Sequence, residues 1–472
     1  MSLKIFNTLT KQKEEFQPLN PPQVKMYVCG ITPYDETHLG HARAYVAFDV
    51  VRRYLEESGY EVNYVQNITD IDDKIINKSK QSAVSCEQIA DQYTDSYFKV
   101  MDELNVKRAT RYPKATETIP DMIKVIQGLM KLGFAYKIEG DVYFVVSKFE
   151  GYGKLSKREK KDMLAGARVK VDERKKDPID FALWKAAKEG EPSWESPWGP
   201  GRPGWHIECS TMSNKFLGET FDIHGGGRDL IFPHHENEIA QSESYTGKPF
   251  VKYWMHNGFV TVNEQKMSKS LGNFFTLKDI FKKYDPIVVR FFLISTHYRS
   301  PINYSDKELQ SAKEAYGRIN KFIQDVDFLL DKSTEVAPTI ELEDLEEELL
   351  EYKDKFKASM DDDFNSAGAI AAIFEMIHFC NKALEEGEVE KESLEIMKSS
   401  VVGLCGVLGL RVESRELEVE SREVKELIAE REEARKKKDF AKADEIRDKL
   451  KAMGVAIEDT PYGTRRIRTS QL

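Results

Sequence analysis

The feature that most constrains the fold is a strand, a helix and a strand in succession near the start of the chain. Residues 26–29 are apolar and predict a short buried strand, which Gly30 and Pro33 end. Residues 39–58 predict a helix that stops at a glycine, and residues 61–66 alternate as a second strand. Such a unit binds its ligand beyond the carboxyl ends of its strands. The predicted fold class is therefore α/β.

The remaining sequence predicts an insertion and a helical second half. Helical spacing over residues 120–132 precedes a predicted hairpin at residues 135–146. Residues 154–202 are rich in charge and then in Pro, Gly and Trp, which indicates a surface insertion. Apolar spacing over residues 306–408 predicts a helical bundle, and a charged stretch with a late arginine cluster follows residue 412.

Composition excludes several classes of protein. The 472 residues exceed one typical domain, and a net charge of −10 argues against a uniformly basic nucleic-acid binder. With 40% hydrophobic residues, the chain can bury enough apolar surface to fold. Five scattered cysteines fit a reducing compartment, and no apolar run approaches the roughly 20 residues that span a bilayer. We therefore expect a cytosolic protein that uses no membrane.

Two histidines stand where the first strand has ended and the helix begins. The sequence there is His38, Leu39, Gly40, His41. The unpaired N–H groups and positive dipole end of a helix start suit a phosphate, and Gly40 lets a ligand lie against the backbone. Histidines that merely cap a surface helix would give the same pattern. Neither a GxGxxG nor a Walker sequence is present, so neither common phosphate loop accounts for the site.

A second pattern is a basic loop with the sequence Lys266, Met267, Ser268, Lys269, Ser270. Two lysines in a small, polar loop can fold over a triphosphate and stabilise charge on a departing pyrophosphate. A solvated basic loop is the plain alternative. Together the two patterns resemble the HIGH and KMSKS signatures of class I aminoacyl-tRNA synthetases, with Leu39 in place of isoleucine.

Further segments narrow the resemblance to one family. Residues 67–76 (NITDIDDKII), 204–210 (GWHIECS), 225–238 (GGGRDLIFPHHENE) and 256–259 (HNGF) resemble those of cysteinyl-tRNA synthetases. The resemblance runs nearly end to end. It implies an ATP-dependent ligase that forms a cysteinyl-adenylate and transfers the cysteinyl group to tRNA(Cys).

The resemblance also implies roles for individual residues. His38 and His41 would hold phosphates, Lys266 and Lys269 would stabilise the leaving pyrophosphate, and Mg²⁺ is expected with ATP. The residues expected to bind cysteine and ATP are Gly30, Thr69, Trp205, His206, His224, Gly227, Asp229, Gly258, Phe259, Ser268 and Lys269.

Four residues match the family's zinc ligands, namely Cys29, Cys209, His234 and Glu238. Spacing alone is poor evidence, because the two cysteines are 180 positions apart, although residues four apart on a helix share one face. The resemblance implies one zinc ion per chain, which would select the substrate thiol and whose hold on sulfur should weaken as pH falls. The adjacent His235 and Glu236 are predicted to point elsewhere and to be structural. The other cysteines are predicted to be ordinary reduced thiols: Cys86, Cys380 and Cys405.

The carboxyl-terminal region carries the expected tRNA contacts. Residues 431–451 hold 9 basic and 6 acidic residues, for which a solvated helix face is the plain interpretation. Residues 459–468 (DTPYGTRRIR) are a better RNA candidate, because Tyr462 and the arginines can stack on unpaired bases. In the family this region recognises the anticodon. The expected partners are L-cysteine, ATP and tRNA(Cys), and we expect a monomer.

The resemblance implies a Rossmann-like parallel-sheet catalytic domain with an insertion, then a helical bundle and a small mixed α/β domain. The predicted boundaries are residues 1–118 and 203–250 for the two halves of the catalytic domain, 119–202 for the connective insertion, 251–309 for the linking domain that carries the KMSKS loop, 310–411 for the bundle, and 412–472 for the anticodon-recognition domain.

Three other functions fit parts of the sequence. A related enzyme could activate cysteine in the same way and transfer it to an amino sugar, but the roughly 160 residues after Asp306 favour tRNA. A zinc hydrolase could use Glu236 or Glu238 as a general base, although HHENE is not HExxH and the KMSKS loop would be unexplained. A noncatalytic RNA-binding protein is opposed by the intact histidine and lysine motifs.

Overall fold

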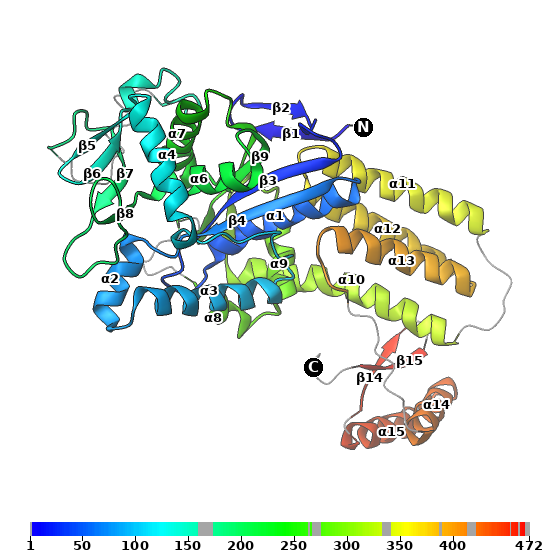
Figure 1. Cartoon of the computed structure of the whole chain (residues 1–472). Coiled ribbons are helices and arrows are strands. Elements are labelled where there is room, and N and C mark those ends of the chain that lie inside the picture. Colours follow the sequence, from blue (N-terminus) through cyan, green and yellow to red (C-terminus); the bar gives the residue numbers. More distant parts are fainter. Residues whose placement is uncertain are drawn as a thin grey trace. The chain divides into compact units, whose positions relative to one another are not determined.

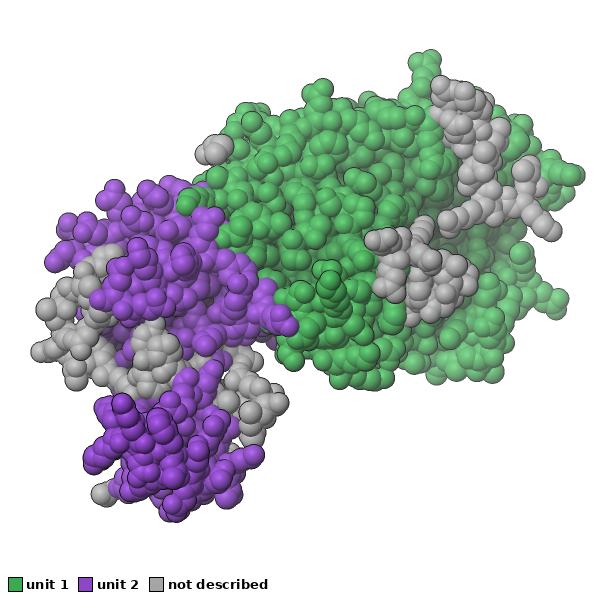
Figure 2. Space-filling model, turned by 180° about the vertical axis from the view of Figure 1, so that it is seen from behind, with its two compact units in different colours: residues 1–313, 355–371, 406–410 green, residues 314–354, 372–405, 411–472 purple. Residues whose placement is uncertain are grey.

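The chain divides into two compact units, which Figure 2 colours separately. Unit 1 comprises residues 1–313, 355–371 and 406–410, and unit 2 comprises residues 314–354, 372–405 and 411–472. The computed structural model describes residues 2–158, 173–262, 265–266, 275–332, 341–386, 389–412, 422–453, 455–460 and 463–467.

A four-stranded parallel sheet in the order β10-β9-β3-β4 forms the centre of unit 1 (Figure 1). The predicted strand, helix and strand are β3, α1 and β4, and the predicted α/β class is confirmed. The chain runs from β3 outward to β4 and later returns to the other side of β3, so the strand order reverses between β3 and β9. The carboxyl ends of these two strands are where an open α/β sheet binds its ligand. The bounds are β3 Gln23–Ile31, α1 Leu39–Glu57, β4 Glu61–Ile68, β9 Phe221–Gly227 and β10 Val251–Asn257.

The register of this sheet decides which side chains meet. Tyr27, His224 and Trp254 are direct neighbours across β3, β9 and β10. Because side chains alternate along a strand, Cys29 and His256 lie on the same face, one step nearer the carboxyl ends. A row of thiol, imidazole and aromatic groups therefore lines one face of the sheet. Helices α6 (Trp205–Leu217) and α7 (Glu236–Thr246) bring further polar groups to that row.

The remaining elements of the first half of the chain form a helical pair, an antiparallel sheet and a short amino-terminal hairpin. The sheet has the order β5-β6-β7-β8, and its first two strands confirm the predicted hairpin. Helix α4 ends just before Gly133, which has a φ of +81°, as predicted. The bounds are β1 Lys4–Asn7, β2 Gln12–Glu15, α2 Asp73–Ser82, α3 Cys86–Glu103, α4 Ile119–Lys131, β5 Ala135–Ile138, β6 Asp141–Phe144, β7 Phe181–Ala186 and β8 Gly201–Pro203.

A small sheet in the order β12-β11-β13 follows β10, and two short helices precede its last strand. Its central and last strands are parallel, with Val260 paired to Ile302. This arrangement brings the segment that follows β10 beside the segment that follows α9. The bounds are β11 Val260–Val262, β12 Gln265–Lys266, α8 Leu277–Phe281, α9 Pro286–Ile294 and β13 Ile302–Tyr304.

The predicted helical bundle is present as four long helices. One of them, α12, is long and apolar enough to cross a membrane, with a mean hydropathy of 1.2 over an 18-residue window. Half of that window is buried inside the protein, and a core helix of a folded bundle passes the same test. The bounds are α10 Asp306–Lys332, α11 Leu342–Asp361, α12 Ser366–Glu386 and α13 Lys391–Val407.

The last part of unit 2 has two helices and a two-stranded antiparallel sheet around a small apolar cluster. Arg431, counted above in a basic stretch, is buried and paired with Asp459, so it is not part of an exposed basic face. Tyr462, Arg468 and the side chains of Arg465 and Arg466 lie outside the described residues. The bounds are α14 Arg422–Lys436, α15 Phe440–Ala452, β14 Ala456–Thr460 and β15 Gly463–Ile467.

Candidate active site and metal cluster

A cleft of about 370 Å³ opens at the carboxyl ends of β3 and β9 and is bordered by the start of α1. The cleft lies beyond the carboxyl ends of the strands, where sequence reasoning placed the ligand, and the structure shows that this is also the strand-order reversal. Nine of the predicted site residues line it: Cys29, Gly30, His38, His41, Trp205, Gly227, Asp229, Gly258 and Phe259. The side chain of Lys266, together with Ser268 and Lys269, lies outside the described residues.

The two histidines of the first motif build the start of α1. His38 is the N-cap, and its Nδ1 accepts the N–H of Gly40 at 3.1 Å, while Nδ1 of His41 accepts the N–H of His38 at 3.5 Å. The two rings stack with centroids 3.7 Å apart. The capping interpretation and the ligand interpretation of this motif are thus compatible, because the histidines that cap the helix also line the cleft. Their stacking holds both imidazoles beside the positive end of the helix dipole.

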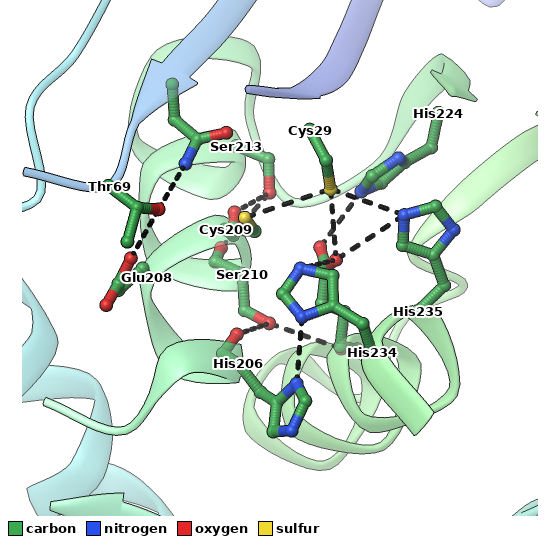
Figure 3. A network of polar contacts seen from close by, with 12 residues as sticks. Cys29, Thr69, His206, Glu208, Cys209, Ser210, Ser213, His224, His234 and His235 are labelled. Atoms are coloured by element: carbon green, nitrogen blue, oxygen red, sulfur yellow. Dashed lines mark hydrogen bonds and ion pairs between the residues drawn. The ribbon is translucent and has the colours of Figure 1, made fainter. Parts of the chain in front are cut away.

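The cleft is closely packed at its junction with β4. A Cβ at Gly30 would lie 1.6 Å from the carbonyl oxygen of Asn67, so no larger residue fits there. The N–H of Gly30 donates to Oδ1 of Asn67 at 2.7 Å. Thr69 is buried rather than exposed to the cleft, and its Oγ1 donates to Oε2 of Glu208 at 2.9 Å (Figure 3). The structure therefore ties Thr69 to Glu208 of α6, the residue directly before Cys209.

At the floor of the cleft, four buried side chains converge (Figure 3). The sulfur atoms of Cys29 and Cys209 are 3.9 Å apart, and Cys29 Sγ is 3.6 Å from Oε1 of Glu238. The same Oε1 atom lies 3.0 Å from Nε2 of His234. These are the four residues that sequence reasoning named as metal ligands, and their ligand atoms all lie within 4.8 Å of one another.

The protonation of this cluster is strongly perturbed. A hydrogen bond from the Cys29 thiol lowers the pKa of Cys209 to about 6, although burial opposes this shift. Burial raises the pKa of Cys29 well above its ordinary value. Burial also opposes ionisation of Glu238 and His234. Attraction to His224 and then to His234 nevertheless brings the pKa of Glu238 down to about 2, and attraction to Glu238 and Cys209 brings the pKa of His234 up to about 10. The protonation of each of the four groups thus depends on its neighbours, and a bound cation would displace protons from them.

His235 contradicts the sequence prediction that it points away from the ligands. Its Nε2 lies 3.3 Å from Cys29 Sγ, and a second set of four possible ligands consists of Cys29, His224, His235 and Glu238. The prediction was wrong because it assumed a continuous helix, whereas α7 begins only at Glu236 and Phe232 has extended φ and ψ angles of −140° and 129°. Glu236 is structural as predicted, since it accepts the N–H groups of Gly153 and Ser156.

The remaining imidazoles form a shell around the ligand atoms. Nε2 of His224 is 2.9 Å from Oε2 of Glu238, and Nδ1 of His206 is 2.9 Å from Nδ1 of His234. His235 continues through its Nδ1 to Nε2 of His256 at 2.8 Å. Burial lowers the pKa of His206, His235 and His256 well below the ordinary value, so these rings are neutral near pH 7. Neutral rings can hold the ligands in place without adding positive charge.

Two features of the cleft were not predicted. Trp205, with 40% of its surface exposed, stacks on His234 with ring centroids 4.1 Å apart, so it covers the cluster on the cleft side. Lys74 is the only Lys or Arg among the described residues that line the cleft, and its Nζ lies 5.1 Å from the ring centre of Tyr34. It belongs to the NITDIDDKII segment, but a single lysine among four charged residues gave no signal of its own.

Comparison with known proteins identifies the family. The model of the class I tRNA synthetase (C) catalytic domain matches residues 15–314, a DALR domain matches residues 355–413, and a cysteinyl-tRNA ligase anticodon binding domain matches residues 420–465. A cysteine–tRNA ligase of Carboxydothermus hydrogenoformans is 52% identical over 98% of this chain and 99% of its own length. The cysteine–tRNA ligase of Geobacter metallireducens is 50% identical over the same shares. The chain belongs to the cysteine–tRNA ligase family.

As a cysteine–tRNA ligase, the chain is a class I aminoacyl-tRNA synthetase that joins cysteine to tRNA. Solved structures of other synthetases share its fold at low identity. A methionyl-tRNA synthetase of Mycobacterium tuberculosis bound to methionyl-adenylate matches with a TM-score of 0.60 at 15% identity, covering 82% of this chain and 89% of that chain. A leucyl-tRNA synthetase of Agrobacterium radiobacter matches with a TM-score of 0.58 at 13% identity, covering 84% and 85%.

Proposed function

We propose that the chain activates L-cysteine as a cysteinyl-adenylate in this cleft and then transfers the cysteinyl group to tRNA(Cys). The observation that carries the proposal is that one cleft is lined both by a helix start suited to phosphate and by Cys29, a member of a buried ligand set suited to a metal that binds sulfur. In the first step the carboxylate of cysteine attacks the α-phosphorus of ATP, and pyrophosphate leaves. In the second, a hydroxyl of the terminal ribose of tRNA attacks the activated carbonyl, and AMP leaves.

The residues at the floor of the cleft fit zinc. Two thiols, one imidazole and one carboxylate form a ligand set that zinc accepts, and their ligand atoms all lie within 4.8 Å of one another, with the sulfur atoms 3.9 Å apart. A zinc ion bound there would supply a Lewis acid that favours the thiolate of a substrate thiol over the hydroxyl of serine. His224 would hold the carboxylate of Glu238 in its orientation, and His206 would do the same for His234.

The residues around the start of α1 would manage the phosphates. The capped histidines present the helix start to the cleft, where the oriented N–H groups and the dipole stabilise negative charge. We assign His38 and His41 to the phosphates of ATP, and Lys266 and Lys269 to the leaving pyrophosphate, with Mg²⁺ accompanying the nucleotide. Catalysis would then come from positioning and charge stabilisation, without a covalent bond between enzyme and substrate.

The other binding roles follow the lining of the cleft. We assign Gly258, Phe259, Gly227 and Asp229 to the adenosine and Trp205 to the cysteine, since all five line the cleft. His206, His224 and Thr69 act through the residues that they contact, because they are absent from the described lining of the cleft. Residues 412–472 would recognise the anticodon, in line with the matching domain model, and the enzyme would work as a monomer.

Cysteine-dependent exchange of labelled pyrophosphate into ATP tests the first step without tRNA. The zinc-loaded protein should exchange label with cysteine and not with serine or alanine. Purified tRNA(Cys) should then accept cysteine, whereas an amino sugar should not. Zinc-loaded protein that exchanges no label with any of the twenty amino acids would overturn the proposal.

A further inference from the structure

One wall of the cleft takes its position from the loop between α9 and β13. The N–H of Gly258 donates to the carbonyl oxygen of Tyr298 at 2.8 Å, and the N–H of Ile302 donates to the carbonyl oxygen of Phe259 at 2.9 Å. A Cβ at Gly258 would lie 2.3 Å from the carbonyl oxygen of Ser300, so the two segments are in direct contact. We call residues 295–300 the backing loop, because the cleft-lining residues 258 and 259 rest against it.

Arg43 contacts the same loop from α1, the helix whose start forms the opposite wall of the cleft. This residue lies in α1, two positions after His41, and only 1% of its surface is exposed. Its guanidinium group donates to the main-chain carbonyls of four residues at the end of α9 and in the backing loop. These are Leu293, Thr296 at 3.3 Å, His297 at 2.8 Å and Ser300 at 3.3 Å.

The guanidinium group of Arg43 is an unusual choice for a purely structural contact. Within the described part of the chain it forms no ion pair, so the carbonyl oxygens and the negative end of α9 alone stabilise its charge. Burial lowers its pKa to about 10, which still leaves it charged near pH 7. Its Nε atom lacks a hydrogen-bond partner, and the residue lines a cavity of about 10 Å³, enough for about one water molecule. An apolar side chain would avoid this cost of burial.

Lysine could not make the same set of contacts. A guanidinium group presents five N–H donors in one rigid plane, whereas an ammonium group presents three donors from a single point. Arg43 reaches the carbonyl oxygens of Thr296, His297 and Ser300 with the donors of that plane. The geometry therefore fixes the separation between the start of α1 and the backing loop.

We propose that Arg43 is a positioning residue for ATP. Through the backing loop it sets the separation between the histidine wall of the cleft and the wall formed by Gly258 and Phe259. This inference rests on the proposed function, in which phosphates lie at the first wall and the adenosine at the second. Arg43 does not line the cleft, so it acts through other residues and touches no substrate.

A second anchor gives an independent way to loosen the loop. Oδ1 of Asp363 accepts the hydroxyl of Tyr298 at 2.9 Å, and its Oδ2 accepts Nε–H of Arg299 at 2.5 Å. This carboxylate belongs to the turn after α11 and contacts neither the cleft nor α1 through these bonds. Loosening the loop at Asp363 should therefore affect ATP in the same direction as a change at Arg43.

Kinetics of pyrophosphate exchange test the inference. We expect Arg43→Lys to raise the KM for ATP at least 10-fold, while the KM for cysteine changes less than twofold because the metal cluster does not rest on the backing loop. Asp363→Asn should raise the KM for ATP by a smaller factor. The control is Arg290→Lys: Arg290 is equally buried in α9, but it pairs with Asp49 of α1 at 2.5 Å and donates to the main-chain carbonyls of Leu104 and Leu408 rather than to those of the backing loop. It should lower the melting temperature without a selective change in the KM for ATP.

Chemical rescue adds a measurement that a general loss of stability would not reproduce. Millimolar guanidinium should lower the raised KM for ATP of Arg43→Ala and leave Arg290→Ala unchanged. The inference is overturned if folded Arg43→Lys keeps the wild-type KM for ATP, or if both substrates' KM values rise by the same factor. If the wild-type enzyme itself exchanges no label, the proposed function fails instead, so the two failures are distinguishable.

Discussion

The two units each bury a polar group, and the two groups satisfy their charge in different ways. In unit 2, Arg431 donates to both carboxylate oxygens of Asp459, at 2.6 and 2.9 Å, and to Thr464 at 2.9 Å. Arg435 pairs with the same carboxylate at 2.5 Å, so the negative charge of Asp459 is balanced by arginines, although Nε of Arg431 has no hydrogen-bond partner. In unit 1 the floor of the cleft gathers two thiols, a carboxylate and several imidazoles, and no described Lys or Arg pairs with them. A buried ion pair between a carboxylate and arginine stabilises a fold, whereas buried thiols, carboxylate and imidazoles without a Lys or Arg partner indicate a metal site.

The largest effect should follow from removing one ligand of the metal. We expect Cys209→Ser to lose most of its bound zinc and to raise the KM for cysteine about 100-fold or more, since a hydroxyl is a much poorer zinc ligand than a thiolate. Metal analysis and pyrophosphate exchange measure the two effects. The matched control is Cys405→Ser, whose parent thiol is equally buried and has a pKa raised by burial to about 12. Full metal content and ordinary cysteine affinity in Cys209→Ser would show that the ligand assignment is wrong.

The two overlapping sets of four ligands can be told apart next. If the first set binds the metal, His234→Gln should lose most of the zinc, while His235→Gln should weaken binding by about 10-fold to 100-fold, as expected for a residue that orients a ligand. Competition with a chromophoric chelator measures both affinities. A larger loss in His235→Gln than in His234→Gln would move the ion to the second set, with His224 as its partner.

What could be predicted from the sequence depended on whether the signal was local. The strand, helix and strand around α1 and the hairpin of β5 and β6 were predicted because apolar period and turn residues are local features. Pairing Cys29 with Cys209 required the family resemblance, since nothing local relates two cysteines 180 positions apart. His235 was assigned wrongly because helical spacing was extended into a segment that is kinked at Phe232. Arg43 left no signal, because its partners are main-chain carbonyls about 250 positions away.

Removing the Arg431–Asp459 ion pair of unit 2 should weaken aminoacylation of tRNA and leave the activation of cysteine nearly unchanged. Asp459→Asn leaves the buried charge of Arg431 without its partner, and we expect a destabilisation of this part by about 1–2 kcal/mol, since Asp459 keeps a third of its side chain exposed. Aminoacylation should show a KM for tRNA several-fold higher, and pyrophosphate exchange should stay within twofold of wild type. The exposed Asp448→Asn in α15 is the control and should change neither assay. An equal loss in both assays would refute the separation.

The smallest effect is the response of the two buried groups to acid, namely the stability that the Arg431–Asp459 ion pair contributes and the zinc content of the metal cluster. The hydrogen bond from Arg431 is the main cause that lowers the pKa of Asp459, from an ordinary 3.8 to about 2. A lowered carboxyl pKa contributes stability that is present above about pH 4 and lost as the pH falls through about 2. Hydrogen exchange over residues 422–467 should therefore differ between wild type and Asp459→Asn equally at pH 7 and pH 5, and the difference should shrink below pH 4. Zinc should leave the cluster over the higher range from pH 7 to pH 4, because protons compete for its thiolates and imidazole. The opposite result would be an exchange difference that vanishes by pH 5 while zinc stays bound at pH 4. The metal cluster would then resist acid better than the Arg431–Asp459 ion pair, and the proposed contrast between the two buried groups would be wrong.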